Sequence, residues 1–328
     1  MEKDIILKLK EANLLGRGGA NFPTWIKWDS LSKNENRVVY IIANGSEGEP
    51  GCFKDEYIIK NYPEQFIEGI KIALRRFPHS EAIIYLNHIY FDKYKTSLEK
   101  YIGDLPITFF RKTARYIAGE ETALMSHIEG MRDEPRVRPP YPTESGLYGS
   151  PTLVNNIETF YRVYEIANDK YKQMTFYSIS GDVAHPGVFE FSEDTSIREI
   201  LVKTKNWPTF DFFVQLGGGA AGSIFLPEEL TLTKYGAASI VVHNRKKTDP
   251  YALMRDWAEF FAAENCDKCT PCRESSMRIL KMVKERKLNF ELLEEMFFVL
   301  EKTSFCPLGR GMPLPYKTLI SKLQLEDK

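Results

Sequence analysis

Apolar residues in the first half of the chain alternate between helical and strand-like spacing. Residues 5 to 15 place Ile and Leu at helical intervals and stop at Gly16, which is typical of a short amphipathic helix. The expected helices are Ile5 to Leu15 and Pro63 to Phe77, with one more before the last strand, and the expected strands are Val38 to Ala43, Glu81 to Leu86 and Ile107 to Phe110. This alternation predicts an α/β domain with a largely parallel sheet over residues 1–170.

The pattern changes in the second half of the chain. Short strands are expected at Phe176 to Ser180, Gly187 to Phe191, Phe212 to Leu216 and Ser239 to Val242, around one helix at Ser196 to Lys203. Helical periodicity returns at Pro250 to Glu264, Ser275 to Lys284 and Phe290 to Lys302. The sequence therefore predicts a small β module over residues 171–246 and a helical bundle over residues 247–328.

The charge balance limits the classes of partner. The chain has 44 basic and 45 acidic residues, so no overall field attracts it to nucleic acid or to an anionic membrane surface. Its start has no cationic stretch followed by a long apolar run, and no window has the length of a membrane-spanning helix. We therefore expect a cytoplasmic protein with no nucleic-acid partner and no direct membrane insertion.

A glycine-rich turn, Gly16 to Trp28, follows the first expected helix. Glycines allow the backbone to approach a ligand and to direct its amides at an anion. The other candidates in this segment are the cations Arg17 and Lys27 and the aromatic residues Phe22, Trp25 and Trp28. A turn without a ligand accounts for the glycines equally well, so the segment alone does not decide between the two interpretations.

Two further loops carry carboxylates. Asn44 to Gly51 follows a strand and contains Glu47 and Glu49, and Glu120 and Glu121 open an apolar helix after another strand. In open α/β sheets the carboxyl ends of the strands are where ligands bind, which favours a functional role for these residues. Acidic residues in the first turn of a helix also complement its dipole, so a structural role for the pair at 120 and 121 stays open.

Two other irregular segments are harder to interpret. The proline-rich loop 135 to 151 is either a linker or a wall of a site, and a helix is expected to begin at Asn155-Asn156. The glycine run 217 to 222 could contact a ligand, but a turn at a domain boundary is the favoured interpretation.

Four of the five cysteines lie in the last quarter of the chain, at Cys266, Cys269, Cys272 and Cys306. Three thiols with C-x2-C-x2-C spacing and a fourth from a distant loop followed by proline match the way a 4Fe-4S cluster is held. A structural zinc site is the alternative, but it usually uses two separate C-x2-C pairs. The spacing favours iron-sulfur, and Cys52 is expected to be a buried or half-buried residue without a ligand role.

The ordered motifs resemble one family closely: the NADH-binding flavoprotein subunit of respiratory complex I and its relatives in soluble NAD-dependent hydrogenases and formate dehydrogenases. The matching segments are Gly16 to Trp28, Asn44 to Asp55, Tyr116 to Glu121, Gly146 to Thr159 and Glu264 to Glu274, with Cys306 beyond. The resemblance implies a Rossmann-like domain for FMN and NADH, then a β-grasp module of the soluble-ligand-binding (SLBB) type, then a helical 4Fe-4S domain. The chain looks like the minimal core of this family.

The resemblance also implies the ligand contacts. The flavin phosphate would lie against Asn155, Asn156, Thr159 and the glycine-rich turn. The residues implied around FMN are Gly16, Arg17, Gly18, Lys27, Asn44, Ser46, Glu47, Tyr116, Gly119, Glu120, Asn155, Asn156 and Thr159.

For NADH, Phe22 would cover the adenine, Glu47 and Glu49 would lie near the ribose, and Glu121 would contact the nicotinamide end. Glu49 and Glu121 are the catalytic candidates. A carboxylate at Glu49 would repel a 2'-phosphate and so favour NAD over NADP.

Three positions depart from the family pattern. Asn21 replaces a glycine, Ser46 replaces an aspartate, and Ser30 occupies the place of a second adenine-stacking aromatic residue. The expected function is electron input: hydride transfer from NADH to FMN, then one-electron transfer to the cluster. The alternative is a non-catalytic relay or scaffold subunit. It would keep the cluster, with or without FMN, and would not bind NADH.

The resemblance implies partners as well. These are a thioredoxin-like 2Fe-2S subunit and a larger iron-sulfur or catalytic subunit, through which the protein would be peripheral to a membrane.

Overall fold

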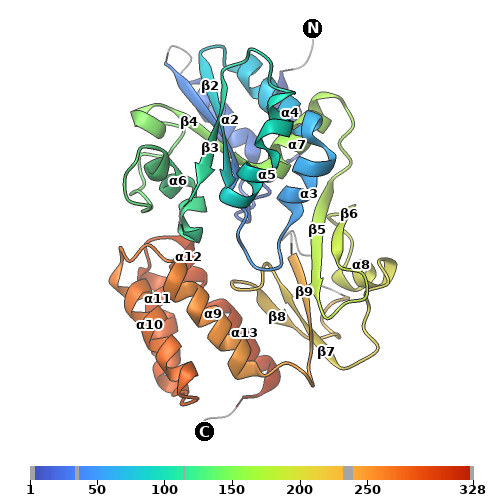
Figure 1. Ribbon diagram of the computed structural model, residues 1–328, viewed down its shortest axis with the longest axis vertical. Helices are drawn as coiled ribbons and strands as arrows, with labels where there is room; N and C mark the ends of the chain where they lie inside the picture. Colours follow the sequence, from blue (N-terminus) through green and yellow to red (C-terminus); the bar gives the residue numbers. More distant parts are fainter. Residues whose placement is uncertain (1–3, 34–36, 114, 232–238, 326–328) are drawn as a thin grey trace. The chain divides into compact units, whose positions relative to one another are not determined.

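The computed structural model describes residues 4–33, 37–113, 115–231 and 239–325, and the chain forms two compact units (Figure 1). The first, called here the α/β unit, comprises Met1–Gly48, Phe53–Ala114 and Ala118–Met174. The second unit comprises Glu49–Cys52, Arg115–Ile117 and Thr175–Lys328. Two short pieces of the N-terminal half therefore belong, by their contacts, with the C-terminal half.

The α/β unit is built on a sheet with the strand order β3-β2-β1-β4, and every pair of neighbours is parallel. The strands are β1 (Val39–Gly45), β2 (Ser80–Asn87), β3 (Ile107–Lys112) and β4 (Thr152–Asn156). The predicted parallel sheet is thus confirmed. Strand β4 was not expected, because it is short and ends in two asparagines after a proline-rich loop.

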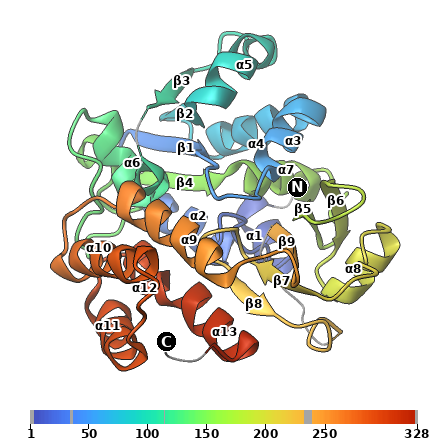
Figure 2. The ribbon, with the colours of Figure 1, turned by 60° about the horizontal axis from the view of Figure 1, so that its bottom comes forward.

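Helices cover both faces of this sheet. On one face α4 (Pro63–Arg76) and α7 (Ile157–Ala167) pack against each other and against β1 (Figure 2). On the other face Leu124 and Met125 of α6 (Glu121–Ile128) form a buried cluster with Ile42, Tyr85 and Val154 of the sheet. The remaining helical segments are α1 (Ile5–Glu11), α2 (Thr24–Ser32), α3 (Lys54–Asn61), α5 (His88–Glu99), η1 (Tyr116–Gly119) and η2 (Leu147–Gly149).

Helices α2 and α3 were not predicted from the sequence. Helix α3 has a short apolar stripe, Ile58 and Ile59, and its first-turn amides are satisfied by the carboxylate of Glu47, which precedes it in the chain. Such a helix depends on a tertiary contact, because short helices are marginal by themselves.

The second unit contains a mixed sheet with the order β6-β5-β9-β7-β8. Its strands are β5 (Met174–Gly181), β6 (Gly187–Ser192), β7 (Phe212–Leu216), β8 (Ser223–Phe225) and β9 (Ser239–Asn244). Helix α8 (Ile197–Lys203) begins at a capping box between Ser196 and Glu199, as its sequence suggests. Four of these five strands were predicted, and the three-residue β8 was not.

The C-terminal part of the second unit is a helical group, visible in orange and red in Figures 1 and 2. It consists of α9 (Pro250–Glu264), α10 (Thr270–Lys284), α11 (Phe290–Thr303), α12 (Pro307–Gly311) and α13 (Pro313–Leu323). Trp257, Phe261, Phe297 and Tyr316 form its fully buried core. Helix α10 begins five residues before the predicted Ser275, because Pro271 is suited to a first helical turn, and Cys272 therefore lies inside the helix.

Candidate functional site

The strand order of the α/β unit reverses between β1 and β4. Asn44 on β1 lies in register with Asn156, the last residue of β4, and Nδ2 of Asn156 donates to the Asn44 carbonyl oxygen at 3.3 Å. Asn156 is also the N-cap of α7, where its Oδ1 accepts from the Glu158 amide at 2.9 Å. Two of the predicted flavin segments thus meet at the switch point of the sheet, the place where open α/β sheets bind ligands.

The glycine-rich turn is fixed to the same edge. The Arg17 amide donates to Thr159 Oγ1 at 2.9 Å, and a Cβ on Gly18 would lie 3.5 Å from the Cβ of Asn156. A Cβ on Gly19 would meet no described atom within 4 Å, so open space adjoins the turn. The side chain of Arg17 is buried and donates to the Tyr171 hydroxyl at 3.1 Å.

The turn before α6 reaches this edge through Gly119. Nδ2 of Asn44 donates to the Gly119 carbonyl oxygen at 2.9 Å, and Oδ1 of Asn44 accepts from the Ser46 hydroxyl at 2.6 Å. A Cβ on Gly119 would lie 2.5 Å from Ser46 Oγ, so a larger residue there would push the two loops apart. The buried Tyr85 hydroxyl also holds this turn, donating to the Ala118 carbonyl oxygen at 3.0 Å.

Glu120 and Glu121 have different surroundings. Glu120 is the N-cap of α6 and accepts from the amides of Thr122 and Ala123, so the structural explanation holds for it. The carboxylate of Glu121 forms an ion pair with Lys27 and lies 3.3 Å from Nη2 of Arg138. Arg138 also pairs with Glu120 at 2.6 Å. The sequence does not single out Arg138, which lies among prolines without a motif of its own.

The two carboxylates of the Asn44 to Gly51 loop belong to different units. Glu47 caps α3, accepting from the Asp55 amide at 3.1 Å, and it accepts from the Tyr90 hydroxyl at 2.8 Å. Glu49 accepts from the amides of Ala220 and Ala221 at 2.9 Å each, within the second unit.

The glycine run 217 to 222 is shaped around Glu49. A Cβ on Gly218, whose φ is +120°, would lie 2.2 Å from Glu49 Cγ, and Nε1 of Trp257 donates to the Gly219 carbonyl oxygen at 2.8 Å. Burial raises the pKa of the Glu49 carboxyl, and the two amides and the Tyr116 hydroxyl oppose that rise. The glycine run therefore binds the Glu49 carboxylate through its backbone amides. The sequence did not predict this contact.

The aromatic residues of the glycine-rich segment differ in exposure. The Phe22 ring is 44% exposed, with the Lys27 ammonium 6.0 Å from its centroid, whereas Trp28 is fully buried against Phe77. Trp28 is therefore part of the core and offers no flat surface to a ligand. Asn155 is buried beside it and accepts from Trp28 Nε1 at 3.1 Å in the amide orientation that satisfies both groups.

Asn21 adopts a conformation that explains its exchange for glycine. Its φ is +49°, in the left-handed region that asparagine tolerates better than other non-glycine residues. The side chain is exposed. A left-handed backbone at position 21 is also compatible with the glycine that the resemblance implies there.

The groups at the switch point suit a flavin phosphate and ribityl chain. Backbone amides of the glycine turn and the N-terminus of the 11-residue helix α7 favour an anion, and the open space at Gly19 gives access. The polar side chains of Asn44, Ser46 and Thr159 provide hydrogen-bonding groups nearby. The residues present therefore fit FMN.

The four predicted ligand cysteines lie at the ends of helices in the second unit. Cys269 is the N-cap of α10, Cys272 lies in the first turn of the same helix, and Cys306 is the N-cap of α12. Burial raises the pKa of the Cys272 thiol to about 12, with further contributions from Cys269, Cys306 and Cys266, so all four sulfurs lie near one another. A Cβ on Gly309 would lie 3.3 Å from the Cβ of Cys272, which explains a glycine after Cys306.

The spacing of these cysteines along the chain, C-x2-C-x2-C and a separate Cys306, matches a cluster better than a single zinc ion. Within the described ranges, no three His, Cys, Asp or Glu side chains are placed to hold one metal ion. A structural zinc site usually uses two separate C-x2-C pairs, whereas here two thiols lie at the start of α10 and a lone thiol lies at the start of α12. This set of cysteines fits a 4Fe-4S cluster.

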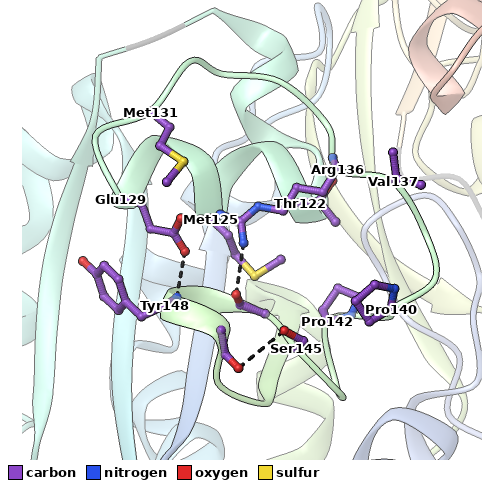
Figure 3. Close-up of a pocket in the computed structure, with 12 residues that line it drawn as sticks. Thr122, Met125, Glu129, Met131, Arg136, Val137, Pro140, Pro142, Ser145 and Tyr148 are labelled. Carbon is purple, nitrogen blue, oxygen red and sulfur yellow. Dashed lines mark hydrogen bonds and ion pairs between the residues drawn. The ribbon is translucent and has the colours of Figure 1, made fainter.

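A pocket of about 700 Å³ lies elsewhere in the α/β unit (Figure 3). Arg136 lies at its wall and pairs with Glu129 at 2.7 Å, and Met131, Val137 and Tyr148 form apolar parts of the lining. Among the described residues, its lining includes none of the ligand contacts implied by the resemblance. Residues of the proline-rich loop 135 to 151 line this pocket.

No helix in the described part of the chain has the length and apolar character needed to cross a membrane.

Two family descriptions match the chain. Residues 9–165 match the Nuo51 FMN-binding domain, and residues 252–326 match the NADH-ubiquinone oxidoreductase-F iron-sulfur binding region. The F subunit of the NADH-quinone oxidoreductase of Streptomyces coelicolor is 32% identical, over 95% of this chain and 79% of that protein. The corresponding F subunit of Aquifex aeolicus is also 32% identical, over 94% of this chain and 81% of that protein.

The fold is also similar to a solved structure. The crystal structure of an NAD+-reducing [NiFe]-hydrogenase in the H2-reduced state has a chain that superposes with a TM-score of 0.90 at 30% identity. The superposition covers 98% of this chain and 61% of the hydrogenase chain.

Proposed function

The chain belongs to the family of NADH-quinone oxidoreductase F subunits, and from this premise we propose that it is the electron-input subunit of an oxidoreductase complex. It is an NADH dehydrogenase flavoprotein with FMN and a 4Fe-4S cluster as cofactors. When bound, FMN accepts a hydride from NADH, and the cluster carries single electrons to a partner. The observation that carries the proposal is the meeting of the glycine turn, Asn44, Gly119 and the start of α7 at the switch point of the sheet.

We propose that the flavin phosphate lies at the glycine turn and the N-terminus of α7, where amides and the helix dipole favour an anion. Asn155, Asn156 and Thr159 line this end, and Asn44, Ser46 and Gly119 lie toward the ring. The other proposed flavin contacts are Gly16, Arg17, Gly18, Lys27, Glu47, Tyr116 and Glu120.

For NADH we propose Phe22 at the adenine, Glu47 and Glu49 near the ribose, and Glu121 at the nicotinamide end. The exposed ring of Phe22 and the ion pair between Lys27 and Glu121 support this assignment, because they put an aromatic surface and a carboxylate of fixed position in the same unit. The left-handed φ of Asn21 supports NADH binding over the relay alternative, because a glycine would adopt the same backbone conformation.

The proposed cluster ligands are Cys266, Cys269, Cys272 and Cys306. Cys269 and Cys272 lie at the N-terminal end of the 15-residue helix α10, whose dipole favours the thiolate forms that ligate iron. The helix dipole thus opposes the burial that raises the pKa of the Cys272 thiol.

We propose that residues 1–170, 171–246 and 247–328 are the flavin, β-grasp and cluster domains. Support for a β-grasp comes from the order of the second sheet, in which β9 lies parallel to and beside β5, with β6 next to β5 and the antiparallel β7 next to β9. Helix α8 lies between β6 and β7 in the chain. A helix between outer strands and a central strand that returns beside the first one support the proposed SLBB-type module.

We also propose the partners: a thioredoxin-like 2Fe-2S subunit and a larger iron-sulfur or catalytic subunit. The support is that the relatives are named as subunits, and that a single-electron carrier requires an acceptor. We further propose that the protein is cytoplasmic and is peripheral to a membrane through such a complex.

The test is anaerobic addition of NADH to the purified full chain loaded with FMN. Bleaching of the flavin absorbance is expected, followed by reduction of the cluster, seen by electron paramagnetic resonance. A bound flavin that NADH leaves oxidised would contradict the proposed function and favour the relay alternative. Zinc without iron or sulfide in metal analysis would contradict the cluster.

A further inference from the structure

A group of charged side chains is buried beneath the start of α7. Lys54, Asp55, Glu158 and Arg162 have exposed fractions of 3%, 2%, 0% and 0%. Nζ of Lys54 lies 2.6 Å from Asp55 Oδ1 and 3.4 Å from Glu158 Oε2, and Nη2 of Arg162 lies 3.4 Å from Glu158 Oε1. Buried ion pairs of this kind are often no more stabilising than apolar residues of the same volume, so stability alone does not explain them.

The group has a specific contact with Asn156. Nδ2 of Asn156 donates to Asp55 Oδ2 at 2.6 Å, and Oδ1 of Asn156 accepts from Lys54 Nζ at 3.0 Å. A carboxylate can only accept hydrogen bonds, and an ammonium can only donate them. The ion pair of Lys54 and Asp55 therefore permits one of the two orientations of the Asn156 amide.

That orientation determines how α7 begins. With Oδ1 turned toward Lys54, the same oxygen accepts from the Glu158 amide at 2.9 Å and caps the helix. With the amide reversed, an NH2 group would face both the ammonium and the Glu158 N–H, and the cap would be lost. A lost side-chain cap leaves a first-turn amide of the helix without its acceptor.

We propose that Lys54 and Asp55 are positioning residues for flavin binding: their buried ion pair orients the Asn156 amide and thereby arranges the first turn of α7 for the flavin phosphate. The inference rests on the proposed function, which puts the phosphate at Asn155, Asn156 and Thr159. Lys54 and Asp55 act through Asn156 and do not themselves touch the flavin.

Asp55→Asn is the sharpest variant, because it keeps the shape and removes the acceptor-only character. In the parent protein one oxygen of Asp55 faces Lys54 and the other faces Nδ2 of Asn156. An asparagine at 55 must present its NH2 to one of these two donors. It then loses either its contact with Asn156 or its contact with Lys54, and the second loss loosens the ammonium that fixes Oδ1 of Asn156.

The experiment titrates flavin-free full-length chain with FMN and with riboflavin, which lacks the phosphate, and follows quenching of flavin fluorescence. For Asp55→Asn we expect FMN to bind about tenfold more weakly or worse, since hydrogen bonds to charged groups are the strong ones, and riboflavin affinity to change less than about twofold. An equal loss for both flavins, or an unchanged preference for FMN, would overturn the positioning role.

Two further variants separate positioning from folding. Lys54→Met/Asp55→Asn removes both charges of the pair at similar volume, and we expect it to fold yet to lose the preference for FMN over riboflavin. Glu165→Gln is the matched control, because Glu165 pairs with Arg162 at 2.7 Å near the C-terminal end of α7, away from the helix start. It should keep the preference. Should the parent chain itself fail to prefer FMN, the proposed phosphate site would be wrong, and the positioning role with it.

Discussion

In the α/β unit, the groups proposed to hold the flavin are fixed by hydrogen bonds to the backbone: Asn44 to the Gly119 carbonyl, and the Arg17 amide to Thr159. In the second unit, the four thiols lie at helix ends, and no three of the described side chains there are placed to hold a single ion. The groups proposed for the flavin are thus positioned by hydrogen bonds at the edge of the sheet. The proposed cluster ligands are thiols at helix ends, and in sites of this kind metal binding is coupled to folding.

We expect the largest effect from removal of a cluster ligand, because it should affect the proposed cluster site and leave the proposed flavin site intact. Cys272 is buried in the first turn of α10 with the other three sulfurs nearby, so Cys272→Ser should nearly abolish bound iron and sulfide while FMN content stays unchanged. Even changes in groups behind a ligand lower metal affinity by about 10–100-fold, and a lost ligand should do at least as much. Iron, sulfide and flavin analyses of the purified chain measure this. A parallel loss of FMN would show that the two sites are not independent.

A substitution at the proposed flavin site of the α/β unit should lower FMN binding and leave the iron content unchanged. In Gly119→Ala the new Cβ would lie 2.5 Å from Ser46 Oγ, which should separate the two flavin loops. Overpacking of this type costs about 1–3 kcal/mol, so we expect FMN to bind roughly 10- to 100-fold more weakly at unchanged iron content. Ser46→Ala in the same chain removes the clashing oxygen and should restore part of the affinity. Failure of this rescue would argue against contact of the two loops as the cause.

Glu49 tests whether a carboxylate held by the second unit takes part in nucleotide choice. Glu49→Gln should raise activity with NADPH relative to NADH by several-fold to about tenfold, because the repulsion of a 2'-phosphate is removed. Burial raises the pKa of Glu49, so in the parent chain discrimination against NADPH should grow as pH rises through that pKa and the carboxyl ionises. Steady-state rates with both nucleotides across pH measure the ratio. An unchanged ratio at all pH values refutes the role.

The smallest expected effect concerns acid stability of the second unit. His243 on β9 stacks on Phe213 with the ring centroids 5.0 Å apart, and burial lowers its pKa from 6.5 to about 4. The unfolded chain therefore binds the proton more readily between these values, so stability is full above pH 6.5 and is lost as pH falls toward 4. The loss at pH 5 should be about 2 kcal/mol.

His243→Gln should remove this part of the pH dependence while leaving flavin affinity unchanged. Urea unfolding of both chains at pH 7 and pH 5 measures the difference. Equal slopes of stability against pH in the two chains would contradict the assignment.

Much of the fold was readable because its signals are local. The apolar run before Asn44 and the amphipathic helix at Pro63 each carry a period that belongs to one type of element, and both were found close to their predicted bounds. Strand β4 was missed because it depends on pairing with the distant strand β1, and a window of sequence does not contain that partner. Helix α3 was missed because its apolar stripe is short and consists of Ile58 and Ile59.

The cofactors show the same division. The sequence by itself indicated the kind of metal group, because C-x2-C-x2-C spacing with a separate Cys-Pro later in the chain is typical of 4Fe-4S ligands. Only the tertiary structure decided that Trp28 is core, that Glu49 rests on the glycine run 217 to 222, and that Lys54 and Asp55 fix the amide of Asn156. The physical reason is that burial and hydrogen-bond direction depend on atoms brought together by the fold from positions far apart in the chain, which the order of residues does not display.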